Sequence, residues 1–318
     1  RDLHKEYRRQ RQMCIRDSDD IVVRKTIDSD VYKNSINSFC KPKPSPTDGS
    51  WFEDFVTPTL SKKEWNYSVS NGFYDDGEYI SGWGNGEIQY YTNPKKNNNK
   101  NTTKNLFIEN GFLKIQPIKN KRTVKGFKFT SARINTKGLK EFTYPAEISI
   151  CFKVPRGIGF WPAFWLMPTE DITWPQGGEI DILENRGRIT NISSSALHFG
   201  KKYNDKSTLV GEVLIPTYAN FQDAFHSVTL KWKKDKLSFY LDNNLIPYFE
   251  INKSHPEFEK YEYPFNRSFY MILNVAVGGK YDDYWVDESA FCNNADCSNK
   301  DLPDMHRFLI DWIEYREL

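Results

Sequence analysis

From Trp51 onward, short runs of alternating apolar and polar residues are separated by Gly, Asn and Asp turn residues. A period of two indicates β-strands, and the pattern contains no long amphipathic helix. Regular short strands joined by such turns are typical of a β-sandwich. We therefore expect an all-β protein. The runs that we interpret as strands are 86–91, 112–115, 146–152, 227–232, 236–242, 269–277 and 308–315.

Three carboxylates fall within the hexapeptide Glu-Ile-Asp-Ile-Leu-Glu at residues 179–184, directly after two glycines. Alternation places Glu179 and Asp181 on one face of a strand, whereas Glu184 would point to the other face. A one-residue β-bulge at 182–183 returns Glu184 to the first face and leaves Leu183 in the core. Acids crowded on one face raise the pKa of one carboxyl and leave another ionised, as an acid/base and a nucleophile require. The alternative is an edge strand with a solvated acidic face.

The composition narrows the classes of function. The 44 basic and 42 acidic residues give a formal net charge of +2, which does not indicate a nucleic-acid-binding protein. No apolar run reaches the roughly 18 residues of a membrane span. Aromatic residues make up 15% of the chain, which suits a sandwich core together with an exposed stacking surface.

The first 45 residues differ from the rest of the chain. The segment 8–18 is charged and aperiodic, and 41–46 is a Pro-rich linker. We expect 1–45 to be a non-domain segment that is disordered or partly artefactual, and 46–318 to be the domain. A basic nucleic-acid-binding arm is the less favoured alternative. Because the chain opens without Met or an apolar segment, we also expect the native start to be missing.

Cysteines and sequons bear on the cellular compartment. Cys292 and Cys297 flank a short polar loop, and the absence of a suitably spaced His favours a disulfide over a metal site. Asn-x-Ser/Thr sequons favour a secreted, extracellular protein. They begin at Asn66, Asn101, Asn191, Asn252 and Asn266.

Several sequence blocks follow one another in a fixed order. They are Trp-Phe-Glu-Asp-Phe at 51–55 with Trp65, Gly-Asn-Gly-Glu-Ile-Gln-Tyr-Tyr-Thr at 84–92, Thr-Ser-Ala-Arg-Ile at 130–134, Gly-Phe-Trp-Pro-Ala-Phe-Trp-Leu-Met-Pro at 159–168, the acidic strand, Leu-His-Phe-Gly at 197–200, Phe-His at 225–226 and Asn-Val-Ala-Val-Gly-Gly at 274–279. In this order they resemble glycoside hydrolase family 16, in its laminarinase-like branch. The resemblance covers roughly 50–318. It implies a jelly-roll β-sandwich of two antiparallel sheets with a concave substrate cleft.

The resemblance also implies a role for each acid. Glu179 would be the nucleophile, Glu184 the acid/base, and Asp181 would tune the protonation of both. Retention needs carboxyls about 5–5.5 Å apart, which same-face strand neighbours supply. The bulged Glu-x-Asp-x-x-Glu pattern resembles that of β-1,3-glucanases, agarases and carrageenases more than that of lichenases, and Trp-Pro-Ala-Phe-Trp favours β-1,3-glucan. We expect retaining endo-hydrolysis of laminarin-type glucan through a covalent glycosyl-enzyme intermediate.

Aromatic and polar residues of the same blocks are the candidates for sugar binding, since Trp offers a flat apolar face with a polar edge. Trp161 and Trp165 share one face of a predicted strand, although core packing is the alternative for each. Arg133 has a structural salt bridge as its alternative, and we interpret His226 as structural. The expected substrate-binding residues are Asn85, Arg133, Trp161, Trp165, His198, Asn274 and Trp285.

The resemblance further implies that catalysis needs no cofactor. Many relatives hold a structural Ca²⁺, and Asp54, Gly111 and Asp311 fall at comparable places. The expected partner is a β-glucan polysaccharide or oligosaccharide, bound by a monomer. One alternative is a non-catalytic β-1,3-glucan recognition protein, and another is a transglycosylase or galactan hydrolase of the same family. Recognition relatives have typically lost one or both Glu residues, so the presence of all three acids favours the enzyme.

Overall fold

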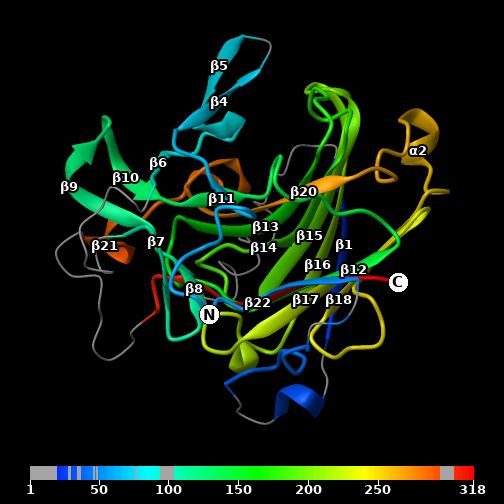
Figure 1. Ribbon diagram of the computed structural model, residues 1–318, viewed down its shortest axis with the longest axis horizontal. Helices are drawn as coiled ribbons and strands as arrows, with labels where there is room; N and C mark the ends of the chain where they lie inside the picture. The colour runs from blue at the N-terminus through cyan, green and yellow to red at the C-terminus, as the bar shows by residue number, and fades with distance from the viewer. Residues whose placement is uncertain are drawn as a thin grey trace, which may run out of the picture.

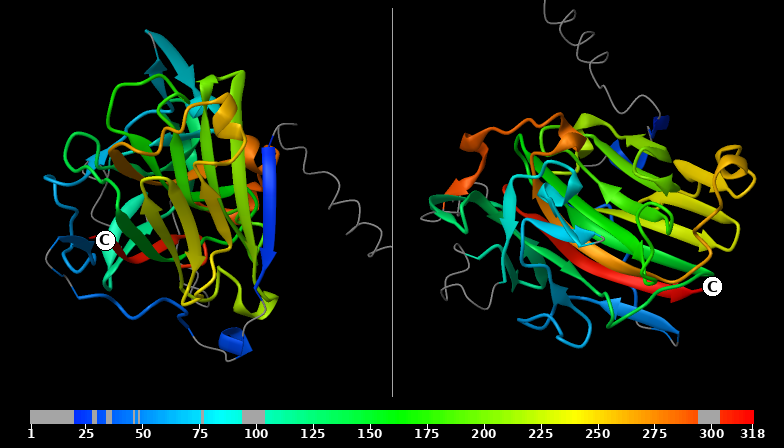
Figure 2. Two further views of the ribbon diagram at one scale, coloured as in Figure 1. Left: turned by 90° about the vertical axis from the view of Figure 1, so that its right-hand side faces the viewer. Right: turned by 90° about the horizontal axis from the view of Figure 1, so that it is seen from above.

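The computed structural model describes residues 20–27, 30–33, 37–45, 47, 49–75, 77–93, 104–293 and 304–318. Over these residues the protein is almost entirely β-structure, and two large sheets pack face to face (Figures 1 and 2). The predicted all-β sandwich is confirmed. In the described part of the chain, no helix is both long enough and apolar enough to cross a membrane. The helices are short: α2 (Glu257–Lys260) and the 3₁₀ turns η1 (Asp30–Lys33), η2 (Gly82–Gly84), η5 (Thr217–Ala219), η6 (Lys280–Asp282) and η7 (Glu288–Ala290).

The first large sheet, called sheet I here, carries the acidic strand near its middle. Neighbouring strands of sheet I run antiparallel, except at one edge, where β1 runs parallel to β16. In spatial order its strands are β1 (Asp20–Thr26), β16 (Asp205–Leu214), β15 (Ile192–Lys202), β14 (Glu179–Glu184), β13 (Phe160–Pro168), β20 (Phe269–Val277), β11 (Arg133–Asn135) and β3 (Asn66–Tyr67).

The second large sheet, sheet II, packs against sheet I and ends the chain. Its strands in spatial order are β19 (Phe249–Asn252), β18 (Lys236–Leu241), β17 (His226–Lys233), β12 (Ala146–Lys153), β22 (Phe308–Glu317), β8 (Phe112–Ile115) and β7 (Leu106–Glu109), and β2 (Ser50–Glu53) also pairs with β22. A smaller sheet contains β21 (Cys292–Asn293), β9 (Ile118–Val124), β10 (Phe127–Ser131) and β6 (Gln89–Tyr91). The hairpin of β4 (Gly72–Asp75) and β5 (Glu78–Ser81) projects from the sandwich (Figure 1).

Alternating side chains of the two large sheets make one core. Ile180 and Leu183 of β14 are fully buried, as are Leu230 and Phe239 of sheet II. Because successive strand residues point to opposite faces, burying these apolar side chains directs their polar neighbours away from the core. The face of sheet I that carries Glu179, Asp181 and Glu184 is called the acid face below.

One predicted strand is much shorter than expected, and one of the sequence blocks divides between two sheets. The run 86–91 shortens to β6, because Gly86 has a φ of 71° and Glu87 makes only an isolated bridge to Gly278. The run 130–134 divides at Ala132 into β10 and β11, which belong to different sheets. By contrast, the predicted strands at 112–115 and 269–277 match β8 and β20 to the residue.

The predicted domain boundary at residue 45 is wrong for the described residues before it. The β-branched run within β1 forms a strand beside β16, and Tyr32 and Phe39 are buried in the core. A disulfide joins Cys40 to Cys151 of β12, across a separation of 111 residues. The described residues from Asp20 onward are therefore part of the sandwich. Residues 1–19 lie outside the described residues.

The predicted Cys292–Cys297 disulfide also reaches beyond the described part of the chain, because Cys297 lies outside it. It stays a prediction. Most of the polar loop at 93–104 likewise lies outside the described residues. The Cys40–Cys151 bridge was not predicted, since nothing in the local sequence relates two cysteines so far apart.

Candidate active site

The three acids of β14 share one face because the strand carries a bulge. Between β13 and β14, Phe164 pairs with Leu183, and the next residue of β13, Trp165, pairs with Asp181. Ile182 is therefore the extra residue of β14. The register toward β15 shifts over the same interval. Both Ile182 and Leu183 are fully buried. The predicted bulge is confirmed, and it turns Glu184 back to the acid face.

Burial and mutual repulsion govern the ionisation of the acids. Burial, followed by the charge of Asp181, raises the pKa of Glu179 to about 8, although the nearby His198 lowers it. Burial and the charge of Glu184 raise the pKa of Asp181 well above its usual range. Asp181 is 4% exposed and Glu184 8% exposed, so water screens neither charge well. This group of carboxyls therefore keeps at least one proton near neutral pH.

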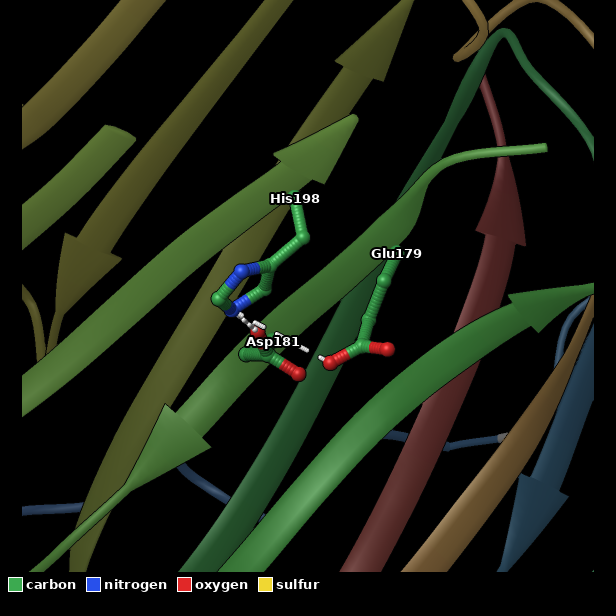
Figure 3. A group of neighbouring side chains, drawn as sticks. All are labelled: Glu179, Asp181 and His198. Atoms are coloured by element: carbon green, nitrogen blue, oxygen red, sulfur yellow. Dashed lines mark ion pairs between the residues drawn. The ribbon is translucent and has the colours of Figure 1, made fainter. Parts of the chain in front are cut away.

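His198 faces two of the acids from the neighbouring strand β15 (Figure 3). Its Nε2 lies 3.1 Å from Asp181 Oδ2 and 4.0 Å from Glu179 Oε1. Its Nδ1 lies 3.0 Å from Thr208 Oγ1, which orients the ring. One ligand atom from each of Glu179, Asp181 and His198 falls within 4.8 Å of the others, so these three residues could hold a metal ion. Glu179 and Asp181 also interact directly, so these two carboxyls can share a proton.

Two indole rings donate hydrogen bonds to the outer acids of the strand. Trp161 Nε1 donates to Glu184 Oε1 at 2.9 Å, and Trp174 Nε1 donates to Glu179 Oε2 at 2.8 Å. Each donor favours the ionised carboxylate. Trp174, from the loop before β14, was missed by the sequence analysis. The signal available was its position five residues before Glu179, in a loop that must turn back over the strand.

Trp165 and Asn274, both expected to bind sugar, lie on the acid face beside the acids. Trp165 Nε1 donates to Asn274 Oδ1 at 2.7 Å. The guanidinium of Arg133 stacks between two indoles, with its Cζ 4.7 Å from the Trp165 ring and 4.0 Å from the Trp83 ring. Cation–π contacts with two indoles restrict the position of this side chain. Trp83, which has an unusual φ of 53°, was also missed by the sequence analysis.

Asn85 belongs to a polar group around a buried acid, Glu87. Asn85 Nδ2 donates to Glu87 Oε1 at 3.2 Å, while Gln89 Nε2 and Tyr91 Oη donate to Glu87 Oε2 at 2.6 and 3.2 Å. Burial raises the pKa of Glu87, and the charge of Arg133 opposes that rise. This network holds Asn85 in place near the Arg133 end of the acid face.

The loop after β20 comes close to the Glu184 end of the acidic strand through Tyr281 and Trp161. Tyr281 stacks on Trp161, with ring centroids 4.9 Å apart and planes inclined by 19°. Lys280 Nζ donates to Tyr203 Oη, at the tip of the β15–β16 hairpin, at 2.6 Å. Tyr203 in turn lies 5.9 Å from the Trp174 ring. Trp285, predicted to bind sugar, lies farther along the same loop with 58% of its surface exposed.

The residues suggested for calcium surround a lysine instead. Lys43 Nζ lies 4.0 Å from Asp54 Oδ2 and 3.8 Å from Asp311 Oδ1, and it donates to Asp54 O at 3.5 Å. Gly111 lies in the turn between β7 and β8. Ca²⁺ needs six to eight oxygens at about 2.3–2.6 Å. With an ammonium group between the two carboxylates, these residues do not fit a calcium ion.

His226 has a structural environment, as predicted. It is fully buried, and its Nδ1 lies 2.9 Å from Asp242 Oδ2. Asp242 also accepts from Tyr32 Oη at 2.6 Å, so this group ties the N-terminal segment to β17 and β18.

Comparisons with known proteins agree with this geometry. Residues 87–290 match the family model described as Glycosyl hydrolases family 16. "Glucan endo-1,3-beta-glucosidase A1" of Niallia circulans is 30% identical over 243 residues, which are 73% of this chain and 34% of that protein. "Beta-1,3-glucan-binding protein" of Penaeus monodon is 35% identical over 173 residues, 47% of each chain. The solved endo-beta-1,3-glucanase from Pyrococcus furiosus has a TM-score of 0.67 and 30% identity, covering 83% of this chain and 92% of its own. The chain thus spans about a third and about half of the two curated relatives.

Proposed function

The chain belongs to glycosyl hydrolase family 16, whose model covers more than half of its residues, and on this premise we propose that it is a secreted, retaining endo-β-1,3-glucanase. The observation that carries the proposal is the bulged strand β14, with three acids on one face and no Lys or Arg at their paired positions on β13 and β15. A glucan chain would lie along the acid face, over Trp165 and Arg133.

In the first step, Glu179 attacks the anomeric carbon while Glu184 gives its proton to the departing glycosidic oxygen. The result is a covalent glycosyl-enzyme intermediate. In the second step, Glu184 takes a proton from water, the water attacks the anomeric carbon, and Glu179 is released. Both steps use carboxyl chemistry alone, so the proposal needs no metal or other cofactor.

Glu179 must be ionised to attack, although its pKa is raised to about 8 by burial and by the charge of Asp181. We assign the retained proton to Asp181, which is the more buried of the two and whose pKa is raised well above normal. A neutral Asp181 removes the charge that opposes ionisation of Glu179, and the Trp174 N–H stabilises the resulting carboxylate.

Substrate binding would use the polar and aromatic groups along the acid face. Arg133 and Asn85 have their donors fixed by neighbouring rings and by Glu87, which suits hydrogen bonding to sugar hydroxyls without further ordering. Asn274 and Trp165 lie between them and the acids. The remaining proposed contacts are His198, Trp161 and the exposed Trp285.

Secretion and a monomeric state are part of the proposal. The Cys40–Cys151 disulfide supports secretion, because disulfides persist mainly in oxidising compartments. Three of the sequons, at Asn66, Asn252 and Asn266, begin at exposed asparagines, which glycosylation in such a compartment would require.

The decisive experiment is reducing-sugar release from laminarin, with lichenan, agarose and carrageenan measured in parallel. We expect release from laminarin that is lost in Glu179→Gln, since an amide cannot form the glycosyl ester. Retention is checked by following the anomer first released by NMR.

The second candidate is a β-1,3-glucan recognition protein, favoured by the 35% identity to the Penaeus monodon binding protein. Laminarin binding without hydrolysis of any of the four polysaccharides would support that alternative and contradict the enzyme. If soluble products become longer rather than shorter in excess oligosaccharide, a transglycosylase is the better description.

A further inference from the structure

The contact between Trp161 and Glu184 depends on a residue outside the acidic strand. Trp161 donates its indole N–H to Glu184 Oε1 at 2.9 Å and presents one ring face to Tyr281, 4.9 Å away. An indole is free to rotate about two side-chain bonds unless something fixes its plane. The ring of Tyr281 stacks on this indole, and Gly279 lies close to the indole ring as well.

Tyr281 is itself held on three sides. The Arg186 Cζ lies 4.1 Å from the centre of its ring, and Arg186 Nε donates to the Tyr281 carbonyl at 2.9 Å. The Tyr281 hydroxyl is 2.6 Å from Ser194 Oγ. Ser194 is paired with Glu184 across β14 and β15, and its hydroxyl donates to the Glu184 carbonyl at 3.3 Å. The tyrosine is therefore anchored to the backbone of the residue whose carboxyl it helps to position.

The anchor continues into buried ion pairs. Arg186 lies 3.9 Å from Glu212 and 3.5 Å from Asp282, and both acids are 2% exposed. Arg188 Nη2 reaches Asp282 Oδ1 at 2.7 Å, and Arg24 of β1 pairs with Glu212. A charge buried in such a network is costly to displace. The loop at 281–282 is thus fixed to β16 and β1 before any substrate binds.

We infer that Tyr281 is a positioning residue for the reaction: it holds Trp161 so that the indole N–H stays on Glu184 and thereby sets the ionisation of the acid/base. The inference rests on the proposed function, because it takes Glu184 as the acid/base. A donor held on a carboxylate favours the ionised form, so losing that donor keeps the acid protonated to higher pH.

Other groups also act on Glu184. Glu179 and Asp181 face it from its own strand, His198 lies beyond them on β15, and Arg186 follows it in the chain. Position 281 therefore has to be changed without changing any charge.

The test compares Tyr281→Leu, which removes the ring, with Tyr281→Phe, which keeps the stack and removes only the hydroxyl. Rates on laminarin are measured across the pH range. For Tyr281→Leu we expect kcat to fall about tenfold, as for loss of one hydrogen bond to a charged group. The basic limb of the profile should move up by about one pH unit, with KM nearly unchanged. Tyr281→Phe should restore most of both values.

Trp161→Phe should give the same shift of the basic limb. The double variant Trp161→Phe/Tyr281→Leu should shift it no further, because both changes remove the same hydrogen bond between Trp161 and Glu184. An unmoved basic limb in Tyr281→Leu, or a change confined to KM, would overturn the inference and make Tyr281 a sugar-contacting or purely structural residue. Additive shifts in the double variant would overturn it as well.

A readout without activity separates this inference from the proposed function. In ¹⁵N-labelled protein, the Trp161 indole N–H signal should move with pH in wild type and stop moving in Glu184→Gln. Its pH response should be largely lost in Tyr281→Leu and kept in Tyr281→Phe. An unchanged response in Tyr281→Leu contradicts the positioning role. Full hydrolysis by Glu184→Gln contradicts the proposed function instead, whatever the indole signal does.

Discussion

Strands β12 and β14 both carry buried acids, but the residues that face these acids differ in charge. Glu147 of β12 is paired across the sheet with Lys231 on one side and Arg316 on the other, and both cations contact its carboxylate. The acids of β14 have neutral residues at their paired positions, apart from His198 opposite Glu179. Burial is similar, since Glu147 is 7% exposed and Glu184 is 8% exposed.

The difference lies in the partners and not in depth. Burial alone would raise the pKa of Glu147, but hydrogen bonds and charge from Lys231 and Arg316 outweigh it and lower that pKa. On Glu179, burial and the charge of Asp181 outweigh the opposing effects of His198 and of the Trp174 hydrogen bond and raise the pKa to about 8. An ion-paired acid is fixed in one state, whereas the acids of β14 keep a proton that they can exchange. This contrast supports the proposal that β14 carries the reactive acids.

The largest expected effect comes from removing the proposed acid/base, Glu184. Glu184→Gln should lower hydrolysis of laminarin by about 10³-fold, the usual size of general acid–base catalysis. A dinitrophenyl glycoside should still glycosylate Glu179, because its leaving group needs no proton, and a burst of dinitrophenol would show this. The matched control is Glu147→Gln, an equally buried change that should leave the rate unaltered. Equal losses in both variants would mean that the substitution damages the fold and not the chemistry.

The next experiment gives β14 the kind of partner that β12 has. His198 lies opposite Glu179 as Lys231 lies opposite Glu147, so His198→Lys places a lasting positive charge beside the acids. We expect the acidic limb of the rate profile to move to lower pH and kcat to fall about tenfold, because the shared proton is lost. His198→Gln supplies a neutral control. Superimposable pH profiles for the two variants would show that the charge at this position does not govern the acids.

The sequence predicts the bulge of β14 correctly because the information for it is local. The spacing of Glu179, Asp181 and Glu184 already requires a bulge, and the apolar residues between them require a buried face. The same reasoning recovers strands such as β8 and β20, whose patterns are unambiguous.

What the sequence does not predict depends on contacts between distant segments. Cys40 meets Cys151 only after the chain has folded, and β1 is recognisable as a strand only once β16 offers an edge. Trp174 and Tyr281 come from loops whose paths no periodicity describes. Lys43 illustrates the same limit. It lies between Asp54 and Asp311, but it belongs to the segment before residue 45, which was predicted to lie outside the domain.

The pH dependence of stability should have opposite signs for the two strands. Glu179 has a raised pKa, so the folded protein holds more protons than the unfolded chain between the ordinary value of 4.5 and about 8, and stability falls as pH rises through that range. Glu179→Gln should therefore raise Tm at pH 8 and change it little at pH 4.5. Glu147 has a lowered pKa, so its stabilisation is present above 4.5 and is lost as pH falls below that value.

Glu147→Gln should accordingly lower Tm at pH 7 and have little effect at low pH. Each kcal/mol corresponds to a shift of about 2–4 °C in a domain of this class. Calorimetry of the two variants at several pH values checks both signs. A Tm gain for Glu179→Gln that is independent of pH would mean that the relief comes from packing and not from charge.

The smallest expected effect comes from removing one of the two cations that hold Glu147. The Lys231 side chain is 41% exposed, so its ion pair at 3.0 Å is screened by water and salt. Lys231→Met should cost less than about 1 kcal/mol of unfolding free energy at low ionic strength and almost nothing in 1 M NaCl. The cost stays small because Arg316 still contacts the carboxylate and keeps it ionised.

Denaturant unfolding at the two salt concentrations measures the effect. The control is Lys236→Met on the neighbouring strand β18, because the ammonium of Lys236 faces the exposed Glu250. A loss above about 2 kcal/mol that survives high salt would show that Glu147 depends on Lys231 as a buried pair does. Loss of Lys231 would then raise the pKa of Glu147, as burial raises the pKa of the β14 acids. The contrast between the two strands would depend on Lys231 alone.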